Sequence, residues 1–482
     1  MHDLRRQALL ESRKTVSRKA ASREASRSTS RVASAQTSRQ NSRQSSRAAS
    51  RYPSDDEDEG NLSDETETWS TGSLDDLADN PESDNVDWPE ELADCMQDIL
   101  DRKRSSVQGR EESLSAFCRL AKFHYVEEEI RGSIQDLLAA FLRSIKYEGS
   151  VRESVLALKA LEFLAVTAYD DTIYDAVESL LTKTIRDSTS GLIKVAAINC
   201  LGTCAYFGGT SEDAKMDQMN MLLDIITSDG QSIEASADYG VVTAALQQWG
   251  FLATDVEDLE ADSEEVVEIL IEQLASVDSN VQIAAGENIA LLYEKSYTPQ
   301  EEEDEIDEDE LDEEGEGGDS SASGGPKLIE RYPAYHDKYH LEQILASLAT
   351  VSGKRISKKD KKSLHTNFAS ILTTVENPRL GPAYSKAINQ NTNRQYGSKR
   401  QVKIGSEGVM EIDRWWKWLR LASLRRILQG GFMEHYFQGN RAVLDALPVM
   451  MRDSRRIDRG GYKKAARMRN STRKMFMDED GI

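Results

Sequence analysis

The sequence predicts an all-α protein: an armadillo- or HEAT-like array of helical repeats, then a small helical C-terminal domain with a basic last helix, flanked by disordered segments. From about Pro89 onward, apolar residues recur three and four positions apart, which is the spacing of one helix face. An Ala/Leu-rich helix then recurs at a period of roughly 40–45 residues, the length of a HEAT or armadillo unit.

Charge is sorted along the chain, although the formal net charge is -24. Residues 1–53 carry about +10, residues 54–353 about -50 and residues 354–482 about +16. An acidic body repels polyanions, whereas an end rich in Arg and Lys can bind them. The two basic ends are therefore the candidates for nucleic-acid contact.

Residues 1–88 are predicted to be a disordered leader, first Ser-Arg-rich and then acidic. Ser-Arg pairs recur from Ser12-Arg13 to Ser50-Arg51 with almost no large apolar side chains, so this segment cannot bury a core. The pairs contact RNA phosphates, or are phosphorylated and so reverse the charge of the segment, or form only a solubilising tail. The acidic part either folds back on a basic end or is simply solvated.

Residues 89–298 are predicted to be the armadillo-like repeats. A single helix pair cannot cover its own apolar face, so stacked pairs share one core. A superhelix of this kind offers a long concave face, which usually binds a peptide or a protein. The Ala/Leu-rich helices are Leu156–Leu164, Val195–Cys204, Val241–Gln248 and Val281–Leu292.

An acidic and then Gly/Ser-rich run at 299–326 predicts a disordered loop inside the array. Residues 327–376 follow as the last repeat helices, with a basic patch. This patch is either a nuclear-localisation or phosphate-binding site, or a solvated loop and helix start. Its members are Lys354, Arg355, Lys358, Lys359, Lys361 and Lys362.

Residues 377–482 are predicted to be the C-terminal domain with its basic tail helix. An amphipathic helix over 411–429 places Trp415, Trp416, Leu419, Leu424 and Leu428 on one apolar side. Its cations lie mostly elsewhere, at Lys417, Arg420, Arg425 and Arg426. The tryptophan cluster is predicted to be core rather than a platform for stacking bases.

The tail that follows is too basic and too poor in apolar residues to join a packed bundle. Either it binds a groove lined with phosphates, where Arg pairs bidentately and stacks on bases, or it is a solvated tail. The candidate RNA-binding residues are Arg452, Arg455, Arg456, Arg459, Lys463, Lys464, Arg467, Arg469, Arg473 and Lys474.

No catalytic or phosphate-binding motif of the common enzyme classes occurs in the sequence. His336 and His340 could share a helix face, but without a third ligand a packing or surface role is favoured over a metal. The four cysteines are predicted to be buried thiols. We expect no enzyme activity, cofactor, metal, membrane span or small-molecule substrate, and a soluble intracellular protein.

Several stretches resemble the interferon-related developmental regulator family. The repeat DSNVQIAAGENIALLYE, the segment LEQILASLATVSGKRISKKDKKSLHTNFASILTTVE and the segment KIGSEGVMEIDRWWKWLRLASLRRILQGGFMEHY are similar to that family's patterns. The basic tail and the acidic leader resemble it as well. The Ser-Arg repeat, the long acidic run at 299–326 and the acidic last residues, MDEDGI, depart from it.

The resemblance implies a non-enzymatic, armadillo-like regulator. It implies a ribosome partner, with the array near the tRNA sites and the basic C-terminal helix on rRNA in the mRNA channel, and a cytoplasmic location. The alternative is a nuclear transcriptional co-regulator that binds protein partners on its repeat surface. An armadillo-type transport receptor ranks last, because the repeats carry no regular Trp/Asn ladder.

Overall fold

The computed structural model describes residues 88–101, 105–168, 170–299, 328–350, 357–389, 394–398, 400–404, 408–447 and 450–451. The chain divides into two compact units, 1–66 and 67–482, and every described residue belongs to the second. The predicted leader (apart from Trp88), the acidic loop (apart from Pro299) and the basic tail therefore lie outside the described residues. The predicted all-α fold class is confirmed.

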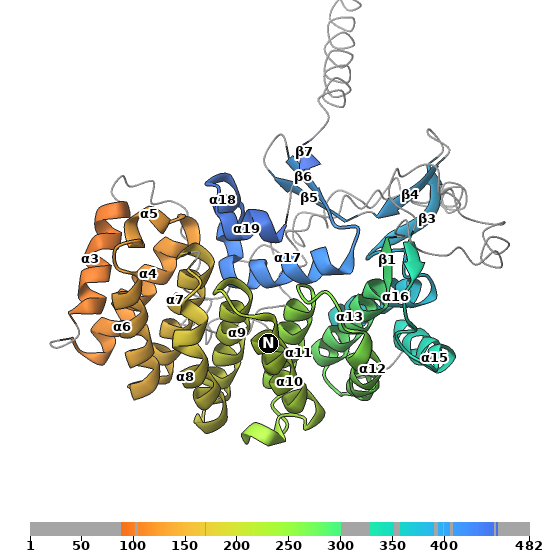
Figure 1. The fold of residues 1–482 in the computed structure, drawn as a ribbon, viewed down its shortest axis with the longest axis horizontal. Helices are drawn as coiled ribbons and strands as arrows, with labels where there is room; N and C mark the ends of the chain where they lie inside the picture. The colour runs from red at the N-terminus through yellow and green to blue at the C-terminus, as the bar shows by residue number, and fades with distance from the viewer. Residues whose placement is uncertain are drawn as a thin grey trace, which may run out of the picture. The chain divides into compact units, whose positions relative to one another are not determined.

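Two layers of helices build the array, as Figure 1 shows. The first layer consists of α3 (Trp88–Leu100), α6 (Ile134–Tyr147), α8 (Ile173–Asp187), α10 (Glu212–Thr227), α12 (Glu260–Leu274) and α15 (Lys338–Ala349). The second layer consists of α4 (Val107–Phe123), α7 (Val151–Ala168), α9 (Gly191–Phe207), α11 (Tyr239–Ala253), α13 (Ser279–Lys295) and α16 (Lys358–Glu376). Each second-layer helix packs on the next, so the layer is continuous.

The predicted Ala/Leu-rich helices all lie in the second layer. These helices contact the first layer on one side and their own neighbours on two others, so their sequences read as nearly continuous apolar runs. The repeat from α9 to α11 is longer than those from α7 to α9 and from α11 to α13, because the turn before α11 contains the short helix η4 (Gln231–Ile233). One further short helix, α5 (Glu127–Ile130), connects α4 to α6.

Side-chain caps begin several of these helices. The Asp238 carboxylate accepts hydrogen bonds from the backbone N–H groups of Gly240 and Val241 at the start of α11. Asp278 caps α13 in the same way, and Ser106 caps α4. Such caps satisfy N–H groups that have no partner within the helix.

Glycines let neighbouring second-layer helices approach closely. A Cβ atom at Gly202 of α9 would overlap the Gln248 carboxamide of α11, and one at Gly250 would overlap that of Asn288. Gln248 Nε2 donates to Asn199 Oδ1 at 3.0 Å, and Asn288 Nδ2 donates to the Leu246 carbonyl at 2.8 Å. The array thus contains a short ladder of amide side chains, which inspection of the sequence did not reveal.

The C-terminal region combines helices with short antiparallel strands that the sequence did not predict. β1 (Tyr297–Pro299) pairs with β2 (Leu328–Glu330), and β3 (Tyr384–Asn389) pairs with β4 (Arg394–Ser398). A three-stranded sheet contains β5 (Gln401–Ile404), β6 (Gly408–Glu411) and β7 (Met450–Met451), with β6 in the middle. The helices are α17 (Trp415–Leu428), η6 (Gln429–Gly431), α18 (Phe432–Phe437) and α19 (Arg441–Ala446).

The helix predicted over 411–429 is α17, but it begins four residues later than expected. Residues 408–411 form β6, whose pairing with β5 and β7 outweighs the helical apolar spacing. The chain leaves the helix at Gln429, which adopts a φ of 48°. Gly431 follows against the Lys122 carbonyl, which a Cβ atom at this position would overlap.

Candidate functional site: helix α17 on the second layer

Helix α17 lies across the second layer of the array and contacts α7, α11 and α13 (Figure 1). Its polar partners in the array come mainly from the C-terminal halves of these helices, of α9 and of α16. We call this surface the docking face; it comprises Glu162, Thr203, Thr254, Glu287 and Glu294. Part of the second layer of the array is thus covered by the chain's own helix.

The first turn of α17 is held by two carboxylates of α13. Glu294 accepts hydrogen bonds from the backbone N–H groups of Trp415 at 2.8 Å and Trp416 at 3.2 Å, so it satisfies donors that the helix leaves open. Glu287 accepts from Trp418 Nε1 at 2.8 Å. Burial raises the pKa of each carboxyl group to about 7, although these donors oppose the rise.

The middle of α17 is held through Arg420. Its Nε and Nη2 donate to Thr254 Oγ1 and to the Thr254 carbonyl, each at 3.0 Å, at the C-terminal end of α11. Asp255 lies 3.5 Å from the guanidinium, and the rings of Trp416 and Tyr206 lie 4.9 and 5.5 Å from it. A cation at this position complements the negative end of the α11 dipole and is enclosed by aromatic rings.

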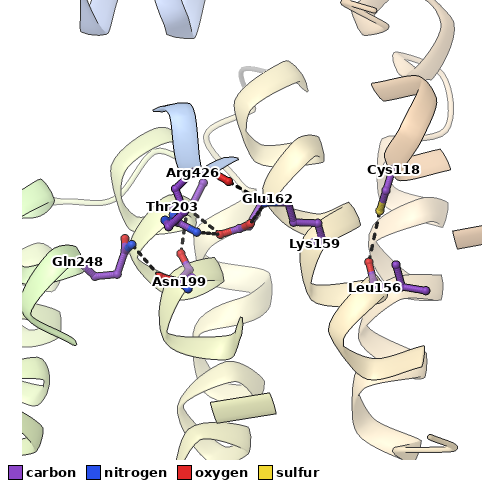
Figure 2. A network of polar contacts seen from close by, with 8 residues as sticks. All are labelled: Cys118, Leu156, Lys159, Glu162, Asn199, Thr203, Gln248 and Arg426. Atoms are coloured by element: carbon purple, nitrogen blue, oxygen red, sulfur yellow. Dashed lines mark hydrogen bonds and ion pairs between the residues drawn. The ribbon is translucent and has the colours of Figure 1, made fainter. Parts of the chain in front are cut away.

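The last turns of α17 are held by the network in Figure 2. Arg426 donates to Glu162 Oε1 at 2.6 Å and to Thr203 Oγ1 at 3.1 Å. Lys159 forms an ion pair with the same carboxylate at 3.2 Å and donates to the Arg426 carbonyl at 3.0 Å. Burial disfavours the Glu162 carboxylate, but Arg426 and Lys159 outweigh it and hold its pKa below the usual value.

The contacts of α17 differ from the prediction that apolar residues face the core and cations lie elsewhere. Arg420 and Arg426, which the apolar spacing placed mostly away from the core side, contact the array. The docking face carries carboxylates and helix carbonyls, which are hydrogen-bond acceptors. Arginine side chains supply donors to these acceptors, whereas leucine side chains would leave them without partners. Trp415 is buried, as predicted for core, and its Nε1 donates to Thr374 Oγ1 at 2.7 Å.

Beyond α17, the chain docks on α4 through His435. This side chain is fully buried; its Nε2 lies 2.9 Å from the Ala121 carbonyl and its Nδ1 lies 3.0 Å from Asn440 Nδ2. Nε2 therefore carries the proton and donates to Ala121, while Nδ1 accepts from Asn440. Burial lowers the pKa of His435 to about 4, so the ring is neutral near pH 7.

The C-terminal segment is thus attached to the array at both ends, at α13 and at α4. A model of the interferon-related developmental regulator family matches residues 58–376. The chain belongs to this family. The matched part ends with α16, so α17 and its contacts lie beyond it. The predicted resemblance is confirmed, and the family is one of regulators rather than enzymes.

The chain is also similar to individual proteins, two of which carry the family's name. An uncharacterized protein of Schizosaccharomyces pombe is 27% identical over 351 residues, which is 72% of this chain and 72% of the relative. Interferon-related developmental regulator 1 of Sus scrofa is 23% identical, over 74% of this chain and 71% of its own length. Interferon-related developmental regulator 2 of Mus musculus is 23% identical, over 76% and 74%.

All ten predicted RNA-binding residues, from Arg452 to Lys474, lie outside the described residues of this family member. Lys354 and Arg355 of the second basic patch do so as well. The other four patch residues, Lys358, Lys359, Lys361 and Lys362, lie in the first turns of α16. The sequence did not predict the arginine and carboxylate pairs of the docking face, because their members stand far apart along the chain.

The histidines and cysteines of the described residues form no metal centre that we can identify. His336 and His340 are exposed, and His336 Nδ1 lies 2.6 Å from Glu264 Oε1. Within the described ranges, no three His, Cys, Asp or Glu side chains come together to bind a metal. The four cysteines are free and buried, as predicted, and burial raises the pKa of Cys95 and Cys118 to about 12.

No helix of the described residues is both long and apolar enough to cross a membrane.

Proposed function

We propose that this chain is a non-enzymatic, ribosome-binding regulator of translation. The array docks near the tRNA sites, and the basic segment from Arg452 to Lys474 contacts rRNA and occupies the mRNA channel, which silences translation in the cytoplasm. Membership of a family of regulators supports a regulatory role. The ribosomal role rests on the resemblance of the C-terminal motifs and on the features below.

One observation carries the proposal: the basic segment begins directly after an anchored strand. β7 pairs with β6 through Met451 with Gly408 and Met450 with Val409, and Arg452 is the next residue. β6 leads into α17, which the docking face holds in place. A segment presented from a fixed point loses less entropy when it binds than one at the end of a free linker.

The distribution of charge supports the same proposal. The first turns of α10 and α12 carry acidic side chains, such as Glu212 and Glu260, on exposed surface. Such a surface repels RNA phosphates, so contact is directed to the basic segment. Binding by that segment releases counterions and should weaken steeply as the salt concentration rises.

Sucrose-gradient sedimentation of cell extracts tests the proposal. The full-length protein should co-sediment with ribosomes, and removal of residues 452–482 should leave it at the top of the gradient. Removal of residues 1–53 is the control, because it deletes the other basic segment of the chain. The proposal fails if the full-length protein stays at the top, or if deletion of 452–482 changes nothing.

A second candidate function, a nuclear transcriptional co-regulator, has one observation in its favour. Lys358, Lys359, Lys361 and Lys362 stand at the start of α16, where positive charge opposes the helix macrodipole. Their charge is therefore not favoured by the helix dipole, and recognition by an import receptor would account for the cluster. On this view a protein partner binds repeat surfaces other than the docking face, which α17 covers.

Microscopy of the protein in cells tests the nuclear candidate, because it shows whether the protein accumulates in the nucleus. Replacement of all four lysines by glutamine should abolish nuclear accumulation, whereas replacement of exposed Lys146 and Lys183 in the array should not. Purely cytoplasmic staining of the unmodified protein contradicts the nuclear function.

A further inference from the structure

Five exposed apolar side chains stand near the starts of five successive second-layer helices. Each stands within two residues of the start of a second-layer helix. Valine and leucine side chains are usually buried in folded proteins, and tyrosine side chains are usually partly buried. We call them the apolar row: Val107, Val151, Leu192, Tyr239 and Val277. Nine large apolar side chains are exposed among the described residues, so more than half of them belong to this one edge.

The apolar row follows the order of the helices in space. α4, α7, α9, α11 and α13 pack side by side in that order, so their first residues form one line. Packed helices lie about 8–10 Å apart, and the row therefore repeats at about that spacing. The docking face uses the other halves of the same helices, so the apolar row lies on the edge away from α17.

Cross-turn hydrogen bonds make this edge rigid. Lys194 Nζ donates to the carbonyls of Ile185 at 2.9 Å and Ile233 at 2.6 Å, which ties the turn before α9 to the turn before α11. Gln273 Nε2 donates to the Ile226 carbonyl at 3.0 Å and so links α12 to α10. Side chains on a rigid backbone lose little conformational entropy when a ligand covers them.

The spacing of the apolar row selects one type of ligand backbone. A polyproline II helix has three residues per turn and rises about 3.1 Å per residue, so every third side chain lies on the same face about 9 Å further along. A β-strand points every third side chain to the opposite face. An α-helix is about 10–12 Å wide and requires a groove, whereas the row is a single line of side chains.

The charge at one end of the apolar row adds a second requirement that a peptide ligand must meet. A groove of ≈ 800 Å³ between α3 and α4 opens beside Val107 and is lined by residues that include Gly109 and Ser113. Its carboxylates are Glu91, Asp94, Asp98, Asp101 and Glu112. Arg102, Lys103 and Arg104 follow Asp101 in the sequence and Arg119 pairs with Glu91, so the five carboxylates outnumber the neighbouring cations by one. This small excess of negative charge favours the basic end of a peptide.

We propose that the apolar row binds a partner protein through a polyproline II segment. The segment carries an apolar side chain at every third position, and Arg or Lys residues at the end that enters the groove beside Val107. The chain's own Ser-Arg segment is a poor occupant because it has almost no large apolar residues. A second copy of the chain fits less well, because stable dimers bury about 800 Å² on each partner and the row is one side chain wide.

Fluorescence polarisation with the full-length protein tests the proposal. The probe is a labelled synthetic peptide of five Leu-Pro-Pro triplets with four arginines at one end, made in both orientations. One control peptide has the same composition with irregular leucine spacing, and another is a helix with leucine at every seventh position. The double variant Leu192→Ser/Val277→Ser removes part of the row, and Phe437→Ser, a comparably exposed residue on α18, is the matched control.

The triplet peptide should bind in one orientation, and the double variant should weaken it about tenfold or more while Phe437→Ser leaves it unchanged. Asp94→Asn/Asp98→Asn should remove the advantage of the arginines. Equal binding of the irregular peptide, stronger binding of the helical peptide, or equal loss with Phe437→Ser overturns the proposal. Self-association that depends on Leu192 and Val277, and that the peptide does not compete with, assigns the row to a second copy instead.

Discussion

The repeat array and the C-terminal segment are both largely helical, but different forces hold them together. In the array, each helix buries an apolar face against neighbours that are near in sequence, such as α7 against α6 and α9. The C-terminal helix α17 also buries apolar residues, such as Leu424, but its docking adds charged groups, such as Arg426 and Glu162, that stand 264 residues apart. The array should therefore tolerate changes of pH and salt, whereas the docked segment should respond to both.

The largest expected effect is the loss of a core side chain from the array. Phe141 of α6 is 0% exposed and its ring lies 5.4 Å from that of Phe117. Phe141→Ala should lower the free energy of unfolding by about 3–5 kcal/mol, because it removes apolar contact and leaves a cavity. Denaturant titration checks this, with exposed Val277→Ala as the control. A loss below that of the control would mean that apolar burial does not dominate the array.

Next in size is the loss of the buried ion pair that holds α17. Arg426→Met leaves the buried Glu162 carboxylate with Lys159 alone and should cost about 3 kcal/mol. The effect should be local: hydrogen exchange should rise in α17 and α18 but not in α6. Arg119→Met, which breaks the exposed pair with Glu91, should be nearly neutral. Equal exchange throughout the chain would show that the docked segment and the array unfold as one unit.

Acidification should loosen the α4 end of the docked segment. His435 stays neutral in the fold, so its contribution is complete above the unfolded pKa of about 6.5 and is lost as pH falls toward the folded pKa of about 4. The complete loss amounts to about 3 kcal/mol, of which about 2 kcal/mol is lost by pH 5. Hydrogen exchange of α18 at pH 7 and pH 5 measures it, and His435→Gln should abolish the pH dependence.

The α13 end should respond in the opposite direction. Glu287 and Glu294 have folded pKa values of about 7, above their usual value of 4.5, so the folded state binds protons more tightly. Their contribution is complete below pH 4.5 and decreases as pH rises toward 7. Trp418 fluorescence across this range reports the change, and Glu287→Gln should reduce it. A signal that is identical in the variant would exclude Glu287 as its source.

The smallest effect should come from a helix cap in the array. Asp278→Ala removes the side chain that accepts from the N–H groups of Asn280 and Val281, and should cost about 1 kcal/mol. Because this cap lies at the opposite end of α13 from Glu294, hydrogen exchange in α17 should not change. Increased hydrogen exchange in α17 would show that the helix cap at Asp278 affects the docking of α17.

Local patterns in the sequence were sufficient to predict the repeats. The recurrence of Leu156–Leu164 and its three counterparts identified the second layer, because each helix buries an apolar face of its own. The strands β3 to β7 escaped prediction because they are short and alternate weakly. For α17 the tryptophan cluster correctly indicated core, but the roles of Arg420 and Arg426 depend on partners that no local window contains.

The sequence by itself determined the helical class, the repeat period, the family and the sorting of charge, since each depends on patterns along the chain. Only the tertiary structure decided that α17 covers the second layer, that two glutamates on α13 hold its first turn, and that five exposed side chains line one edge. The physical reason is that these features join residues from separate repeats, and their energies depend on burial and distance. Both properties exist only once the helices have stacked.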